Sequence, residues 1–169
     1  MNTVAELNGM SERGFTVALD GIWEHSPWVV ERAEGGRPFA NRASLVAGME
    51  AVVDAATERE RLKLICAHPD LAGKLASAGR LTAESTGEQA SAGLSALTDA
   101  EREAFTERNE AYRERFGFPF VICAREHSKA GILAEFARRL DQDGEAEAAT
   151  AITEIKKIAR MRVEDRIRD

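Results

Sequence analysis

Cysteine is scarce in this sequence. Only Cys66 and Cys123 occur among 169 residues, and both stand in apolar runs, where a free thiol behaves as a small hydrophobic side chain. We therefore expect reduced thiols and no disulfide framework, as is typical of cytosolic proteins. A thiol nucleophile paired with His68 is disfavoured, because residues two apart in an extended segment point to opposite faces.

Histidine and cofactor-binding motifs are scarce as well. The three histidines, His25, His68 and His127, are isolated in the sequence, whereas a zinc site needs three or four ligands at helical or loop spacing. GxGxxG, P-loop and GxSxG patterns are absent. The sequence therefore predicts no metal site and no cofactor. We interpret His25, which lies near a proline between two tryptophans, as structural.

Long apolar runs and clustered positive charge are also missing. No run approaches the roughly 18 apolar residues of a membrane span, and residues 1–10 lack the basic-then-apolar pattern of an export signal. Residues 166–169 do not form a Ser-Lys-Leu type peroxisomal signal. With 23 basic and 29 acidic residues the net charge is -6, and the basic residues form no patch. We expect a soluble, cytoplasmic protein without nucleic-acid or membrane partners.

Helical periodicity dominates what is present. The 44% hydrophobic content suffices for a core in a chain of this length, so we predict one compact all-α domain over residues 1–169. Helices are predicted at residues 41–56, 58–66, 98–116, 128–140 and 145–166. The pattern leaves open whether residues 58–66 continue the preceding helix or form a separate one.

Four of these helices have a predicted inner face. The faces are Phe105, Asn109, Tyr112 and Phe116; Leu133, Phe136, Ala137 and Leu140; Ala148, Ile152, Ile155 and Ala159; and, in the helix at residues 41–56, Leu45, Met49, Val52 and Val53. Asn109 is polar, and if it is buried its amide must find hydrogen-bond partners. The third face continues to Arg162, which is either a snorkelling side chain or an anion-binding group at the edge of a pocket.

The segment Phe118–Cys123 departs from the helical pattern. Its sequence, FPFVIC, is short, apolar and rich in residues that favour an extended conformation, but no partner strand is evident. Its backbone groups therefore need other partners, and a bound ligand could be one of them.

A second break in the pattern occurs at His68, which directly precedes Pro69. Because proline disfavours the helical conformation of the residue before it, we expect His68 at a helix end, held extended. Its imidazole, with an ordinary pKa of about 6.5, could act as a general acid or base. The alternative is a hydrogen-bonded histidine that only ends a helix.

The stretch STGEQ, Ser85 to Gln89, also has two interpretations. Ser-x-x-Glu is a capping box, in which Ser85 would cap a helix and Glu88 would reach back to it. A helix start also offers amide protons and a positive dipole end, and with these polar side chains it could bind a small polar ligand.

Seven motifs, in this order along the chain, resemble those of the 2-oxo-4-hydroxy-4-carboxy-5-ureidoimidazoline (OHCU) decarboxylases of urate breakdown. They are LN at Leu7-Asn8, EHSPW at Glu24 to Trp28, RPF at Arg37 to Phe39, AHPDLAGK at Ala67 to Lys74, STGEQASAGL at Ser85 to Leu94, NEAYRERFGFPFVICAR at Asn109 to Arg125, and EIKKIARMR at Glu154 to Arg162. The resemblance covers nearly the whole chain.

The resemblance implies an all-α domain of about eight helices with one short extended segment. It implies a cofactor-free homodimeric enzyme that converts OHCU to (S)-allantoin and carbon dioxide. The catalytic residues of the family fall on His68 and Glu88. Its substrate-binding positions fall on Pro69, Ser85, Thr86, Gly87, Gln89, Phe120, Val121, Ile122, Cys123, Ala124 and Arg162.

Two other classes of function stay open. One is a helical adaptor without enzymatic activity, whose extended segment and Asn109 form a partner interface. The other is an enzyme of a different class, such as a hydrolase, that acts on a related ureido or imidazoline compound.

Overall fold

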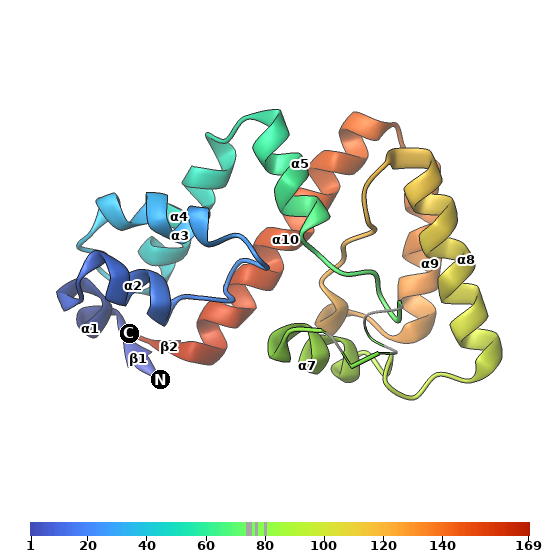
Figure 1. Ribbon diagram of the computed structural model, residues 1–169, viewed down its shortest axis with the longest axis horizontal. Coiled ribbons are helices and arrows are strands. Elements are labelled where there is room, and N and C mark those ends of the chain that lie inside the picture. The colour runs from blue at the N-terminus through green and yellow to red at the C-terminus, as the bar shows by residue number, and fades with distance from the viewer. Residues whose placement is uncertain (74–75, 77, 80) are drawn as a thin grey trace. The chain divides into compact units, whose positions relative to one another are not determined.

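The computed structural model of the protein describes residues 1–73, 76, 78–79 and 81–169 (Figure 1). Its elements in chain order are β1 (Asn2–Thr3), α1 (Val4–Gly9), α2 (Glu12–Ala18), α3 (Pro27–Ala33), the 3₁₀ helix η1 (Glu34–Gly36), α4 (Arg42–Asp54), α5 (Glu58–Cys66), α7 (Ala83–Ser91), α8 (Asp99–Phe116), the 3₁₀ helix η2 (Ala124–Glu126), α9 (Lys129–Leu140), α10 (Gly144–Arg166) and β2 (Ile167–Arg168). This confirms the all-α prediction. Within the described ranges, no helix is long and apolar enough to cross a membrane.

The chain divides into two compact units. Unit 1 contains Met1–Ala67 and Lys156–Asp169, and unit 2 contains His68–Ile155. Helix α10 contributes its first part to unit 2 and its last part to unit 1. That the whole chain acts as one domain stays a prediction.

Unit 1 brings together motifs that are far apart in the sequence. The Asn8 side chain donates to the carbonyl of Phe39 at 2.8 Å and accepts from its amide at 2.9 Å. Arg37 donates to the carbonyl of Met10 at 2.6 Å. The LN and RPF motifs therefore hold each other, which gives them a structural role in this unit.

The two short strands of unit 1 were not predicted. They pair in parallel, with Asn2 opposite Ile167 and Thr3 opposite Arg168, so the two ends of the chain lie side by side (Figure 1). A ladder of two residues is too short to produce a period of two in the sequence.

The core of unit 2 is aromatic. Helix α8 packs against α9, and the rings of Phe120 and Phe136 stack with their centroids 3.7 Å apart. Tyr112 from α8 meets Phe120 edge to face at 5.2 Å. The segment that follows α8 therefore returns into the space between α8 and α9 and becomes part of the core.

The predicted helices are confirmed within two residues at each end, and their caps explain the boundaries. Asn41, Thr57, Thr98 and Ser128 each accept a hydrogen bond from an amide in the first turn of the following helix. Since Thr57 caps α5, residues 58–66 form a separate helix.

The predicted inner face of α9 is partly wrong. The buried side chains are Ile132, Phe136 and Arg139, while Ala137 is exposed. A charged residue takes an inward position because Glu147 and a backbone carbonyl bind it there. On α10 the predicted face is buried at Ile152, Ile155 and Ala159 and half-buried at Ala148.

Candidate functional site

His68 lies where the sequence predicts it, at the end of a helix. Helix α5 ends at Cys66, and His68 follows in a bend just before Pro69. Its side chain belongs to the buried part of the protein, with 6% of its surface exposed. An imidazole in such a place is shielded from bulk water and held at the start of a loop.

The loop after His68 is fastened at three consecutive residues. Gln89 accepts from the amide of Ala72 at 2.9 Å and donates to the carbonyl of Asp70 at 3.4 Å. Asn109 donates to the carbonyl of Leu71 at 2.9 Å. Ala72 has a positive φ of 50°, a conformation that a residue other than glycine keeps only where its surroundings impose it.

The side-chain nitrogen of Asn109 therefore has the hydrogen-bond partner that a buried amide needs. Its side-chain oxygen, Oδ1, is also buried but has no hydrogen-bond partner in the part of the chain that the structure describes. An ion pair between Asp70 and Arg113, 2.9 Å apart, holds the loop on its exposed side. Lys74, the last residue of the AHPDLAGK motif, lies outside the described residues.

Helix α7 carries the STGEQ motif, but the capping-box interpretation of that motif is wrong. The helix begins at Ala83, and Thr82 is its N-cap, accepting from the amide of Ser85 at 3.2 Å. Ser85 and Glu88 thus lie inside the helix, where neither can serve as its cap.

The residues of the STGEQ motif lie on two different faces of helix α7. Ser85 and Gln89 are buried and Glu88 is half-buried, as expected for residues three and four apart. Thr86 and Gly87 are exposed. Since Gln89 holds the loop after His68, the face with Ser85 and Glu88 belongs to the same part of unit 2.

The extended segment has no strand pairing in the described part of the chain, as the sequence predicts. All of Phe120, Val121, Ile122, Cys123 and Ala124 are buried. The carbonyl of Val121 accepts from Arg139 Nη1 at 2.8 Å, and the amide of Cys123 donates to Glu154 Oε2 at 2.9 Å. Side chains from α9 and α10 therefore supply the partners that a neighbouring strand would supply in a sheet.

The three sequence features come together in unit 2. Helix α7 packs against η2, which starts at Ala124 where the extended segment ends. The same helix binds the loop after His68 through Gln89. Helix α7, with its polar face, therefore lies next to both the loop after His68 and the end of the extended segment.

Arg162 lies in unit 1, so the structure does not place it in this group. Its guanidinium is buried and donates to Glu24 Oε2 and to the carbonyl of Gly21, each at 2.8 Å. The snorkelling interpretation is therefore wrong, and the pair joins the EHSPW motif to EIKKIARMR. That Arg162 contacts a substrate stays a prediction.

A buried polar network that the sequence pattern does not reveal lies next to the extended segment. Arg139 and Glu147 form an ion pair with almost no exposed side-chain surface, and the hydroxyl of Tyr112 donates to the same carboxylate. Burial, and then the hydrogen bond to Glu147, raise the pKa of Tyr112, so its hydroxyl stays protonated. Helical periodicity could not find this pair, because it assigns charged residues to the exposed face.

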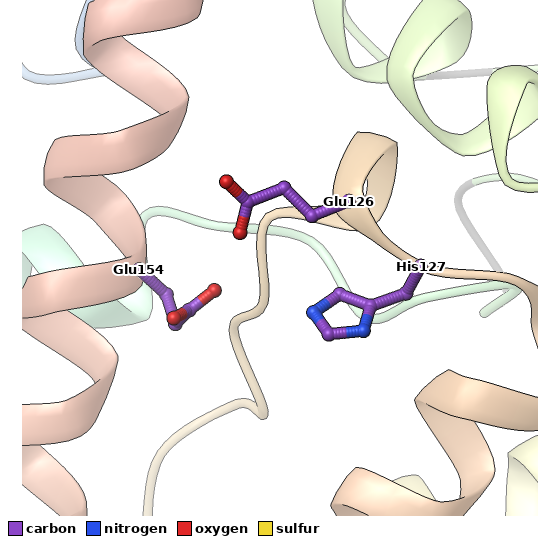
Figure 2. Close-up of side chains that lie close together, drawn as sticks. All are labelled: Glu126, His127 and Glu154. Atoms are coloured by element: carbon purple, nitrogen blue, oxygen red, sulfur yellow. The ribbon is translucent and has the colours of Figure 1, made fainter.

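Three side chains of unit 2 lie close enough together to bind a metal ion. The ligand atoms of Glu126, His127 and Glu154 are within 4.8 Å of one another, and Figure 2 shows the three groups turned toward a common space. His127 is therefore not isolated in the fold. However, Glu154 is already bound to the amide of Cys123, and the other two residues are less buried. We assign Glu154 to the backbone segment, and the absence of a metal stays a prediction.

The chain is similar to known proteins in both its sequence and its fold. The family profile for OHCU decarboxylase matches residues 8–164. The OHCU decarboxylase of Haloferax volcanii is 39% identical over 97% of this chain and 95% of the relative, and that of Amia calva is 39% identical over 95% and 91%. The crystal structure of an (S)-allantoin synthase superposes with a TM-score of 0.78 at 32% identity, covering 98% of this chain and 54% of that one. The chain belongs to the OHCU decarboxylase family.

Proposed function

We propose that this protein is a carboxy-lyase that converts OHCU to (S)-allantoin and carbon dioxide in urate degradation. Its relatives are named for this decarboxylation. The observation that carries the proposal is the buried His68 at the start of a loop that helix α7 holds through Gln89. The burial of His68 supports this role, because it keeps a proton-exchanging group in a part of the protein shielded from water.

The substrate itself explains why such a site needs few catalytic groups. Loss of carbon dioxide leaves an electron pair on a ring carbon of OHCU, and the adjacent carbon–nitrogen double bond can accept it. The protein then has to hold the carboxylate out of the ring plane, remove its water, and deliver a proton to one face of the intermediate.

We assign the proton delivery to His68. An imidazole changes its charge close to neutral pH, so it can donate a proton and recover it within one turnover. Pro69 and the fastened loop behind it limit the motion of the imidazole. A fixed donor reaches one face of a planar intermediate, which is the condition for forming a single enantiomer.

We assign the orientation of the substrate to helix α7 and the extended segment. Glu88 would accept hydrogen bonds from the hydroxyl or ureido groups, with Ser85 and Gln89 beside it. The Ser85 amide donates to Thr82, so its hydroxyl is the group assigned to the substrate. Backbone groups of Phe120 to Ala124 would bind the ring and ureido atoms. Thr86 and Gly87 are exposed and stay predicted contacts only through the family resemblance.

We keep Arg162 as a proposed counter-charge for the substrate carboxylate. Its interaction with Glu24 would lower its effective positive charge. That suits the reaction, because a very strong contact with the carboxylate would stabilise the ground state and slow the release of carbon dioxide.

The test is to add the purified protein to a urate-oxidation mixture after the hydroxyisourate step. OHCU loss is followed in the ultraviolet, and the optical rotation of the allantoin is measured. Faster loss of OHCU with an excess of (S)-allantoin is the expected result. A different product would indicate a hydrolase. An unchanged rate of OHCU loss would favour the helical adaptor without enzymatic activity.

A further inference from the structure

The buried backbone of the extended segment is held at both of its edges by charged side chains. Arg139 of α9 donates to the carbonyl of Val121, and Glu154 of α10 accepts from the amide of Cys123. The segment then turns, with the amide of Glu126 bound to the carbonyl of Cys123 at 3.0 Å. Residues on two different helices thus set where the segment lies and how it is rotated about its axis.

The two charged side chains are themselves fixed. Arg139 is 1% exposed and is bound to Glu147, which also accepts from Tyr112. Glu154 is 8% exposed and lies inside α10, far from either end of that helix. A buried side chain on a rigid helix has few rotamers available, so its hydrogen bond defines the position of the bound amide closely.

We propose that Glu154 is a positioning residue for the reaction, with Arg139 as its counterpart on the other side of the segment. This inference rests on the proposed function, in which backbone groups of Phe120 to Ala124 bind the substrate. Glu154 holds the Cys123 amide and so keeps the neighbouring backbone groups aligned for the ring and ureido atoms. It acts through the segment and does not touch the substrate.

The hydrogen-bonding role makes a specific demand on residue 154. It requires an oxygen that accepts from an amide, and it does not require a negative charge. Glutamine provides that oxygen at the same distance along the side chain, whereas alanine does not. A charge-based role, including metal binding with Glu126 and His127, would instead fail with glutamine as completely as with alanine.

The experiment compares Glu154→Gln with Glu154→Ala, and uses Glu145→Ala, an exposed glutamate on the same helix, as the matched control. Misplaced binding groups weaken substrate and transition state together, so KM for OHCU should rise about tenfold in Glu154→Ala while kcat changes less. Glu154→Gln should recover most of this loss. Equal losses in the alanine and glutamine variants, or an unchanged KM in both, would overturn the proposal.

A second readout does not depend on activity. Hydrogen exchange of the Cys123 amide should be faster in Glu154→Ala than in the wild-type protein. In Glu154→Gln it should be slower than in the alanine variant. If the wild-type protein does not consume OHCU, the proposed function fails, and the exchange rates still decide whether Glu154 holds the Cys123 amide. Unchanged exchange in Glu154→Ala would overturn it, and so would a loss of activity on chelator treatment that Zn²⁺ restores.

Discussion

Among single residues, the buried polar side chains decide how the site is built. Gln89 and Asn109 hold consecutive residues of the loop after His68. The sequence identifies Asn109 as a polar residue on an apolar stripe, but it does not reveal the bonded carbonyl, which lies 38 residues away in the chain. A residue that interrupts a pattern can therefore be found from the sequence, while its partner requires the fold.

The buried ion pair between Arg139 and Glu147 is expected to affect the stability of the protein strongly when one partner is removed. Arg139→Met should reduce the free energy of unfolding by about 3–5 kcal/mol, because it leaves the Glu147 carboxylate buried without its charged partner. The double variant Arg139→Met, Glu147→Leu should recover much of that loss, since no buried charge remains. Urea unfolding of the two single variants and the double variant measures the coupling. Additive losses would contradict the account.

A substitution of Glu88 distinguishes a role in substrate binding from a role in capping helix α7. Because Thr82 caps α7, Glu88→Gln should leave the helix content and the unfolding midpoint unchanged, while turnover falls because the substrate is held less well. Circular dichroism and steady-state kinetics measure the two effects, and Thr82→Ala is the matched variant that should lower stability. Lower stability with normal turnover in Glu88→Gln would restore the capping interpretation.

Among the elements, the predictable features are those with a local cause. Helices α4, α5, α8 and α9 start where Asn, Thr or Ser caps precede an amphipathic run, and this can be read from neighbouring residues. The inward position of Arg139 depends on Glu147 and Val121, which belong to other elements, and the ladder between β1 and β2 joins the two ends of the chain. Local patterns do not contain that information.

The hydrogen bonds at the N-terminus of α5 predict that the stability of the protein depends on pH. Arg32 donates to Glu60 at 2.5 Å, and the backbone and hydroxyl of Thr57 also donate to it. These hydrogen bonds lower the pKa of the Glu60 carboxyl from 4.5 to about 2. The folded state therefore favours the ionised form, and the resulting stabilisation is present above pH 4.5 and is lost as the pH falls toward 2.

An NMR titration of the Glu60 side chain should show a midpoint close to 2. In Glu60→Gln the part of the acid-induced destabilisation that occurs between pH 4.5 and pH 2 should be smaller. A midpoint near 4.5 in the folded protein would show that the capping interactions are not formed in solution.

For the whole molecule, the family could be identified from the sequence because seven motifs occur in order along the chain. The structure explains why several of them are present. LN binds RPF through Asn8 and Phe39, and EHSPW binds EIKKIARMR through Glu24 and Arg162. A linear sequence shows that such motifs occur together but not that they touch, so their separate roles in packing and in the site needed the fold.

The oligomeric state is a further prediction at this scale. The family resemblance implies a homodimer, so light scattering of the purified protein should give about twice the mass of the 18.5 kDa chain. A mass equal to one chain at concentrations where the protein is active would contradict this prediction.

The most direct test of the central claim is the enantiomeric purity of the allantoin formed by His68→Asn. Asparagine keeps a polar side chain at this position but cannot deliver a proton as imidazole does. The variant should keep the circular dichroism spectrum of the unchanged protein and lose the stereospecific production of (S)-allantoin. A folded variant that remains active and equally stereoselective would contradict the role of His68 as the proton donor.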